Sequence, residues 1–300
     1  MRVLICFDGS DSAAHAVQLV VGRAWPEKSF FKLFSVRGSL DGRNFQELAL
    51  EPLQKRFGAH FVTAEERTAG HVGEAILHVA SQWYADLIAM GSRDRVGLTR
   101  LVLGSVSDFV LRRAHCSVLV ARETNHSFFL PASEKSFANA MKILICIDDF
   151  ADSLAAVNYL LSSTWPDGTE FIVLKVMEHG LQDFSLGVTL PWVSVPYEGD
   201  IAEGKAIVSA ANVVGHVSAV LEERFPNCEI TELIQEGFPA LRILAVAREH
   251  HADLIVMGAK GRTDDGSLRD MDSPKHRLGS IAAAVAEEAP CSVQIVRRSP

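Results

Sequence analysis

The stretch RVLICFDGSDS at Arg2–Ser12 returns as KILICIDDFADS at Lys142–Ser153, and this repeat sets the architecture of the chain. Each copy opens with a short apolar run that leads into an aspartate. Two later stretches are also repeated: ADLIAMGS at 85–92 as ADLIVMGA at 252–259, and AHCSVLVAR at 114–122 as APCSVQIVR at 289–297. A repeat on this scale indicates two copies of one folding unit in tandem. A length of 300 residues fits two domains of ordinary size.

The separation between equivalent residues grows along the chain, which locates the differences between the copies. Trp25 returns as Trp165, but the later ADLI and CSV stretches return at progressively greater separations. The second copy therefore carries a long insert after its second strand and a shorter one in a later glycine loop. We predict a first domain at 1–122, a linker at 123–141 and a second domain at 142–300. The insert around 178–225 and the enlarged loop at 262–278 belong to the second domain.

Short apolar runs alternate with helical spacing inside each copy. In the first copy the runs predict buried strands at Val3–Phe7, Phe31–Val36, Leu87–Met90 and Val118–Ala121. Apolar residues between them recur at intervals of three and four, which predicts amphipathic helices. Continuous apolar strands that alternate with such helices are typical of a parallel sheet covered on both faces. We therefore expect two doubly wound α/β domains. In the insert, a loop at 180–200 and a helix from about Ile201 to Phe225 are predicted.

The composition restricts the function classes. An apolar content of 48% with 22% charged residues is that of a globular protein. A net charge of −8 disfavours non-specific binding to nucleic acid or to an anionic membrane surface, since both need a basic field. No apolar run reaches the length of about 20 residues that spans a bilayer. We expect a cytoplasmic protein without nucleic-acid or membrane partners.

The five cysteines do not predict a metal or disulfide site. Their number is odd and no two have the CxxC spacing. Cys6 and Cys146 fall inside apolar runs, and Cys116 and Cys291 directly precede others. We interpret them as small buried hydrophobic side chains.

Two loops in each copy are placed to bind a ligand, because open parallel sheets bind ligands at the carboxyl ends of their strands. One follows the first strand, with Asp8 in the first copy and Asp148 in the second. The other is a glycine loop, at 91–105 and at 258–280, that ends in Gly-Ser. Glycines let backbone amides approach an anion, and a following helix start favours negative charge. We expect Ser105 and Ser280 to cap these helices and to reach a phosphate, although Gly-Ser can also mark a helix start alone.

These loops carry a resemblance to a known family. The pattern Gly-x2-Gly-x9-Gly-Ser/Thr after the fourth strand, with Asp at the end of the first, resembles the ATP-binding signature of universal stress proteins. The ADLIxMG run and the PCSV segment support the resemblance, which covers nearly the whole chain. It implies a five-stranded parallel sheet of order 3-2-1-4-5 in each domain, with ATP as cofactor and Mg²⁺ as an option. The adenine would lie near Asp8 or Asp148, and the phosphates on the glycine loop. The implied binding residues are Asp8, Gly91, Gly104 and Ser105 in the first copy, and Asp148, Gly258, Gly261, Gly279 and Ser280 in the second.

Neither copy matches the pattern completely. In the first copy Asp94 replaces the second glycine. At an effective dielectric constant of about 20, like charges 4 Å apart repel by about 4 kcal/mol, so this carboxylate opposes a triphosphate unless Arg93, Arg95 or a metal compensates. In the second copy all glycines are present, but the segment between Gly261 and Gly279 is nearly twice as long as the pattern requires. We expect the second copy to be the better nucleotide site.

The sequence leaves several functions open. The first is a nucleotide-binding regulator with slow or no hydrolysis, and the second is a stress-response scaffold with degenerate sites that acts through protein contacts. A different ligand, such as a cyclic nucleotide or a lipid-like molecule under the insert, is a third. Asp148-Asp149 also permits a Mg²⁺ site like that of phosphoacceptor receiver domains. No catalytic residue stands out, and neither a P-loop nor Gly-x-Gly-x2-Gly after the first strand is present.

The resemblance also implies pairing of the two domains. Single-domain members commonly dimerise through the last strand. Val118–Ala121 and Val293–Val296 are therefore expected to pair within the chain as a pseudo-dimer. A further homodimer is compatible with this arrangement, and the sequence identifies no protein partner.

Overall fold

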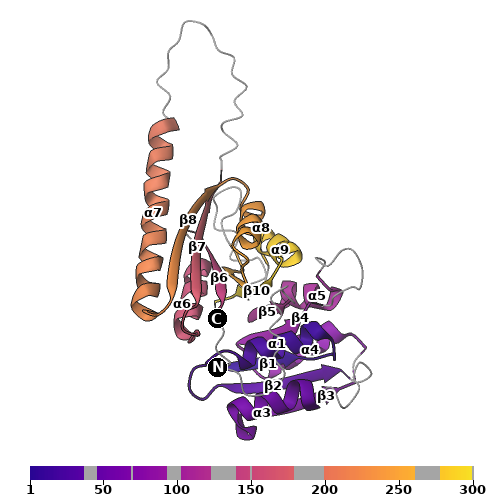
Figure 1. Cartoon of the computed structure of the whole chain (residues 1–300). Helices are drawn as coiled ribbons and strands as arrows, with labels where there is room; N and C mark the ends of the chain where they lie inside the picture. The colour runs from indigo at the N-terminus through magenta and orange to yellow at the C-terminus, as the bar shows by residue number, and fades with distance from the viewer. Residues whose placement is uncertain are drawn as a thin grey trace, which may run out of the picture.

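The fold is one continuous sheet with helices on both faces. A computed structural model of the chain describes residues 1–36, 46–68, 70–92, 103–122, 140–148, 151–178, 199–260 and 278–298. Ten strands in these ranges form a sheet of order β3-β2-β1-β4-β5-β10-β9-β6-β7-β8 (Figure 1). We call β1–β5 with their helices the first half and β6–β10 with theirs the second half.

The elements of the first half follow the predicted alternation of strand and helix. Two short turns, η1 (Gln46–Leu50) and η2 (Ala59–Phe61), flank α3. The other elements are β1 (Arg2–Cys6), α1 (Asp11–Val21), β2 (Phe30–Val36), α3 (Glu51–Phe57), β3 (Val62–Arg67), α4 (Val72–Gln82), β4 (Leu87–Gly91), α5 (Ser105–Arg113) and β5 (Ser117–Ala121).

The second half repeats this order with one much longer helix. Its elements are β6 (Lys142–Ile147), α6 (Ala151–Ser162), β7 (Glu170–Met177), α7 (Gly199–Arg224), β8 (Glu229–Glu236), α8 (Pro239–Glu249), β9 (Leu254–Gly258), α9 (Ser280–Glu288) and β10 (Ser292–Val296). The helix predicted in the insert is confirmed as α7, which lies beside β8 at one end of the molecule (Figure 1). The domain boundaries at 122 and 142 stay predictions.

Strand pairing confirms the predicted topology. Within each half every pair of neighbouring strands is parallel, and the order is 3-2-1-4-5. The halves join where β10 runs antiparallel to β5, with Val293 opposite Val120 and Ile295 opposite Val118. The expected pairing of the two last strands within the chain is therefore confirmed.

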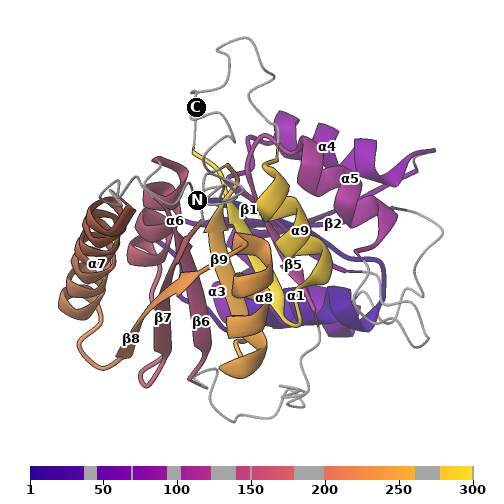
Figure 2. The ribbon, with the colours of Figure 1, turned by 90° about the horizontal axis from the view of Figure 1, so that it is seen from above.

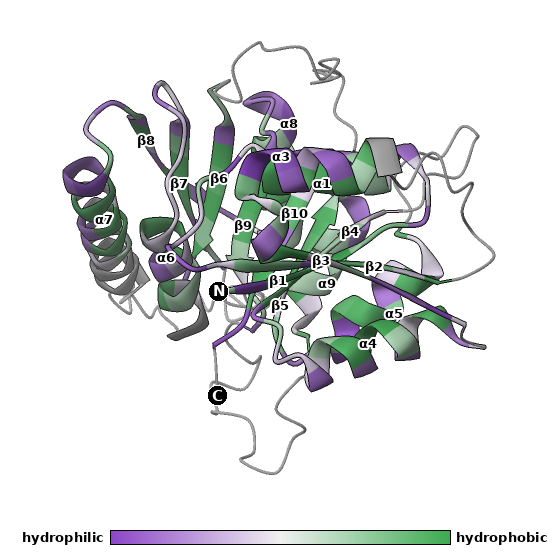
Figure 3. Cartoon of the chain, turned by 90° about the horizontal axis from the view of Figure 1, so that it is seen from below, coloured by the Kyte–Doolittle hydropathy of each residue, from purple (hydrophilic) through white to green (hydrophobic). Residues whose placement is uncertain are grey.

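Two hydrophobic layers hold the helices on the sheet. One layer lies under α1, α3, α6 and α7, and the other under α4, α5, α8 and α9 (Figure 2). Strand residues alternate between the layers, so that Leu4 belongs to one and Ile5 to the other. Figure 3 shows most of the central strands in green, for hydrophobic residues, and the helices in bands of green and purple, for residues of both kinds. Because both faces of the sheet are covered, its strands read as continuous apolar runs. Among the described helices none is long and apolar enough to cross a membrane.

Candidate functional site

A cleft opens at the carboxyl ends of three strands in the first half. It is lined by residues 6–8, 34–36, 90–91 and 104–107, together with Ala13, Val72 and Ile76. Its empty space of about 680 Å³ includes open solvent at the mouth, and the part that a water-sized sphere can reach is about 90 Å³. That enclosed part is smaller than the roughly 300–1,000 Å³ of typical small-molecule sites, so a larger ligand would extend into the open mouth. The cleft spans the boundary between β1 and β4, where the winding of the sheet reverses, and such switch points bind ligands in this fold class.

Asp8 is fixed at the end of β1 by a tight turn. Gly9 has a φ of 82°, which lets the chain reverse before α1. The Ser10 amide and hydroxyl both donate to Asp8 Oδ1, at 3.1 and 2.6 Å. Ser10 Oγ also accepts from the Ala13 amide and so caps α1. The carboxylate is therefore held at the cleft by the same residue that starts the helix.

Asp148 takes the equivalent position in the second half through different contacts. Its backbone amide donates to Ser153 Oγ at 2.9 Å, and the Ser153 hydroxyl donates to Asp148 Oδ1. Ser153 lies in α6, so the anchoring serine follows the aspartate by five residues instead of two. Both halves thus fix an aspartate at the end of their first strand. Asp149 lies outside the described residues.

The starts of α5 and α9 correct one expectation about the glycine loops. The N-caps are Gly104 and Gly279, and Ser105 and Ser280 are the first helical residues. Neither cap glycine can offer a side chain, and no side chain caps either helix. The capping role expected for the serines is therefore wrong. The first amides of a helix have no acceptor inside it, so an anion from outside can accept from them.

Gly91 is required by packing as well as by its place at the cleft. A Cβ atom at this position would lie 2.5 Å from both Ser12 C and Ala13 N, at the start of α1. The carbonyl of Gly91 accepts from the Ser107 hydroxyl at 2.9 Å, which ties the first turn of α5 to the end of β4. The glycine therefore permits close contact between β4 and α1, a role that its sequence pattern alone did not reveal.

The cleft joins an apolar wall to a polar end. Val36, Ile76 and Met90 supply apolar surface, and Asp8 and the uncapped start of α5 supply polar groups. Burial raises the pKa of the Cys6 thiol well above its usual range, so this lining residue stays protonated and is a poor nucleophile. The arrangement offers free helix amides for an anionic group at α5, a carboxylate acceptor for a hydrogen-bond donor at Asp8, and apolar surface between them.

The structure brings together some of the predicted site residues. Asp8, Gly91, Gly104 and Ser105 all line the first-half cleft. Asp148 follows β6, Gly258 ends β9, and Gly279 and Ser280 begin α9, which are the equivalent positions of the second half. Asp94, Gly261 and the enlarged loop at 262–278 lie outside the described residues. The expectations attached to them stay predictions.

Sequence reasoning missed the side of the cleft that α4 and β2 provide. Val72 and Ile76 come from α4, and Val36 ends β2. The rule that ligands sit at the carboxyl ends of strands points to Val36, because the strand was predicted to end there. No local pattern marks Val72 or Ile76, whose place depends on how α4 packs beside α5.

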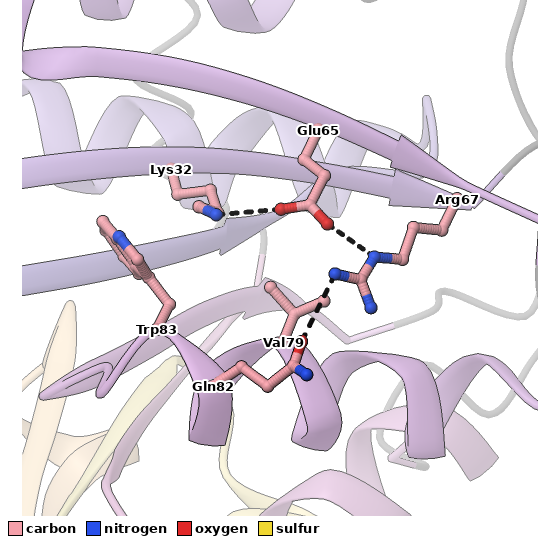
Figure 4. A pocket seen from close by; sticks show the side chains of 6 residues that line it. All are labelled: Lys32, Glu65, Arg67, Val79, Gln82 and Trp83. Carbon is pink, nitrogen blue, oxygen red and sulfur yellow. Dashed lines mark hydrogen bonds and ion pairs between the residues drawn. The ribbon is translucent and has the colours of Figure 1, made fainter.

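A second hollow on the first half has its charges already paired. Figure 4 shows Lys32, Glu65 and Arg67 beside Trp83. Lys32 Nζ lies 2.8 Å from Glu65 Oε2, and Arg67 Nε donates to the other oxygen of the same carboxylate. The hydrogen bond from Lys32 lowers the pKa of Glu65, burial opposes this shift, and the hydrogen bond from Arg67 adds to it. We interpret this hollow as a surface charge network on the edge strand β3 rather than a ligand site. Within the part of the chain that the structure describes, no group of three or more His, Cys, Asp or Glu residues could hold a metal ion.

Comparisons with known proteins identify the family. A model of the universal stress protein family matches residues 32–122 and 139–297. The chain belongs to the universal stress protein family. It is 23% identical over 310 residues to universal stress protein Rv2005c of Mycobacterium tuberculosis, an alignment that covers 98% of this chain and 92% of the relative.

Two solved structures share the arrangement of the whole chain. One is a candidate universal stress protein of Pseudomonas aeruginosa, with a TM-score of 0.64 and 15% identity over 98% of this chain and 92% of that one. The other is a universal stress protein of Archaeoglobus fulgidus, with a TM-score of 0.54 and 18% identity over 99% and 98%. At these identities the likeness supports the fold alone.

Proposed function

We propose that this protein is an adenine-nucleotide-binding regulator of the stress response and that ATP binds in the first-half cleft. The observation that carries the proposal is the joining of Asp8, an apolar wall and the uncapped start of α5 in one open hollow. The adenine would lie against Val36 and Ile76, and the phosphates would accept from the first amides of α5. Nucleotide occupancy would then change a surface that protein partners contact.

The proposal departs from the sequence-based preference for the second half. The cleft where Asp8, Gly91, Gly104 and Ser105 meet belongs to the first half, and residues 93–102 of its glycine loop, like 261–277 of the second, lie outside the described residues. The carboxylate of Asp94 would repel the phosphates of ATP in the first half, so the proposal includes a Mg²⁺ ion or an arginine that compensates this charge. Hydrolysis is expected to be slow or absent, and a cytoplasmic location stays a prediction.

A matched pair of substitutions tests the site in each half. Gly104 and Gly279 have φ of −65° and −68° and extended ψ, the ordinary geometry of an aspartate N-cap. Gly104→Asp should place a carboxylate over the first amides of α5 and raise helix stability by about a few tenths of a kcal/mol. The same carboxylate would take the place of a phosphate and repel the rest of the nucleotide. Gly279→Asp does the same in α9.

The assay is isothermal titration of ATP, with and without Mg²⁺. We expect wild type and Gly279→Asp to bind and Gly104→Asp to lose binding while its melting temperature is unchanged or higher. If only Gly279→Asp loses ATP binding, the nucleotide site lies in the second half, and Gly261→Asp should then also lose binding. Asp94→Gly should strengthen binding in the first half. No heat from wild type at millimolar ATP would refute nucleotide binding and favour the alternative, a scaffold that acts by protein contacts.

A further inference from the structure

Two equivalent arginines cross from one half of the molecule to the other. Arg297 follows β10 and is buried, and its guanidinium donates to the carbonyl oxygens of Leu111 at 2.7 Å and Cys116 at 3.5 Å. Arg122 follows β5 and is also buried, and it donates to the carbonyl oxygens of Ala286 at 2.5 Å and Glu287 at 3.0 Å. Each side chain therefore contacts the last turn of a helix that belongs to the other half.

The backbone fixes both arginines symmetrically. The Arg297 amide donates to Ser117 Oγ, and the Arg122 amide donates to Ser292 Oγ, each at 3.1 Å. The two serines begin β5 and β10, the strands that join the halves. These contacts between the halves therefore accompany the antiparallel pairing of β5 and β10, and separating the halves would break them.

The helices that these arginines contact are the ones that start at the candidate sites. α5 begins beside the first-half cleft at Gly104, and its last turn meets Arg297. The nine residues of α5 span about 13 Å at the usual rise of about 1.5 Å per residue. The last carbonyls of a helix lack partners inside it and favour a cation. A buried guanidinium fork therefore anchors one end of the helix whose other end faces the cleft.

We propose that Arg297 and Arg122 are positioning residues, each of which holds the ligand-facing helix of the opposite half. Arg297 sets the place of the first amides of α5 at the first-half cleft, and Arg122 does the same for α9. Each site is then complete only when the two halves are paired. This inference rests on the proposed function for its effect on ligand affinity, but the effect on the helix is independent of any ligand.

The charge of Arg297 must be separated from its contacts. Because α5 is about 13 Å long, a guanidinium at its last turn lies farther than the Debye length of about 8–10 Å from a phosphate at its first turn and attracts it weakly. Arg298 is the adjacent residue and is exposed, so Arg298→Met removes the same charge without removing the contacts with α5. It is the matched control for Arg297→Met. Arg297→Lys retains the charge but lacks the planar fork, and should restore affinity only in part.

The experiment measures ATP affinity by titration and hydrogen–deuterium exchange without ligand in these variants and in Arg122→Met. We expect Arg297→Met to weaken ATP binding at the first-half cleft by about fivefold or more, within the range of typical coupling between sites. It should also speed exchange across 105–113. Arg298→Met should change neither quantity by as much as about twofold. Arg122→Met should speed exchange across 280–288 and leave the first-half affinity unchanged.

Two results would overturn the proposal. One is equal affinity in Arg297→Met and Arg298→Met, and the other is exchange across α5 that is unchanged by Arg297→Met. If wild type binds no ATP, the proposed function fails, and the exchange data alone decide the inference. Faster exchange across 105–113 in Arg297→Met, but not in Arg298→Met, then supports it. If Arg297→Met does not fold, Arg297→Lys is tested in its place, with the same directions expected.

Discussion

Replacement of Gly91 by alanine tests the contact that shapes the cleft. Gly91 ends β4, where the strand passes the first turn of α1. A methyl group there would lie 2.5 Å from Ser12 C and Ala13 N and 2.6 Å from Ser12 Oγ, whereas ordinary contacts begin at 3.4 Å. Two of these three atoms are backbone and cannot rotate away. β4 and α1 must therefore separate by up to about an ångström, in a region where both are buried.

The expected loss of stability follows from this geometry. Overpacking a well-packed core by one methyl group usually costs about 1–3 kcal/mol. For domains of roughly 150–250 residues, about 1 kcal/mol corresponds to a change of roughly 2–4 °C in melting temperature. We expect Gly91→Ala to melt about 3–10 °C below wild type in thermal denaturation followed by circular dichroism.

Gly215 supplies the matched control, because replacing it by alanine should raise the stability of the protein instead of lowering it. Gly215 lies inside α7, and nothing lies within 4 Å of a Cβ atom at its position. Alanine is the better helix former, so Gly215→Ala should gain about 0.5–1 kcal/mol. If Gly91→Ala melts at or above the wild-type temperature while Gly215→Ala behaves as expected, the close approach of β4 to α1 is wrong.

Two further predictions concern titration and thiol chemistry. Burial, reinforced by the Arg23 charge and opposed by a hydrogen bond with Gln18, lowers the pKa of His15 below 6.5. As the pH falls, the imidazole of His15 is therefore protonated in the unfolded chain at a higher pH than in the folded protein. The stabilisation that neutral His15 contributes above pH 6.5 is lost as the pH falls through and below that value. The urea midpoint of wild type should fall more than that of His15→Gln between pH 7 and 5, and parallel curves would contradict this. Burial also raises the pKa of all five cysteines. When the native protein is treated with iodoacetamide near neutral pH, only the partly exposed Cys228 should be labelled, and slowly. Mass spectrometry of the labelled protein measures this. Rapid labelling of Cys6 would contradict its burial.

Local signals in the sequence placed most of the elements in order, but β3 was not predicted from them, because this edge strand buries only one residue, Val62, and lacks an apolar run. Apolar runs and helical spacing predicted β1, β2, β4 and β5 to within one residue at each end. The repeat identified two copies, and the family resemblance then supplied the order 3-2-1-4-5 and the pairing of β5 with β10. Asp8, Gly91, Gly104 and Ser105 were also found in this way, because the carboxyl ends of parallel strands meet at one edge of the sheet.

How these elements act on one another depends on the tertiary structure. The Arg297 guanidinium meets Leu111 across a long separation in the sequence, a contact that no local period encodes. The clash that excludes a side chain at Gly91 arises from α1, which lies far earlier in the chain. Likewise, Val72 and Ile76 line the cleft only because α4 packs beside α5. Short-range periodicity specifies which face of an element is buried, but the neighbour it meets depends on the packing of the whole sheet.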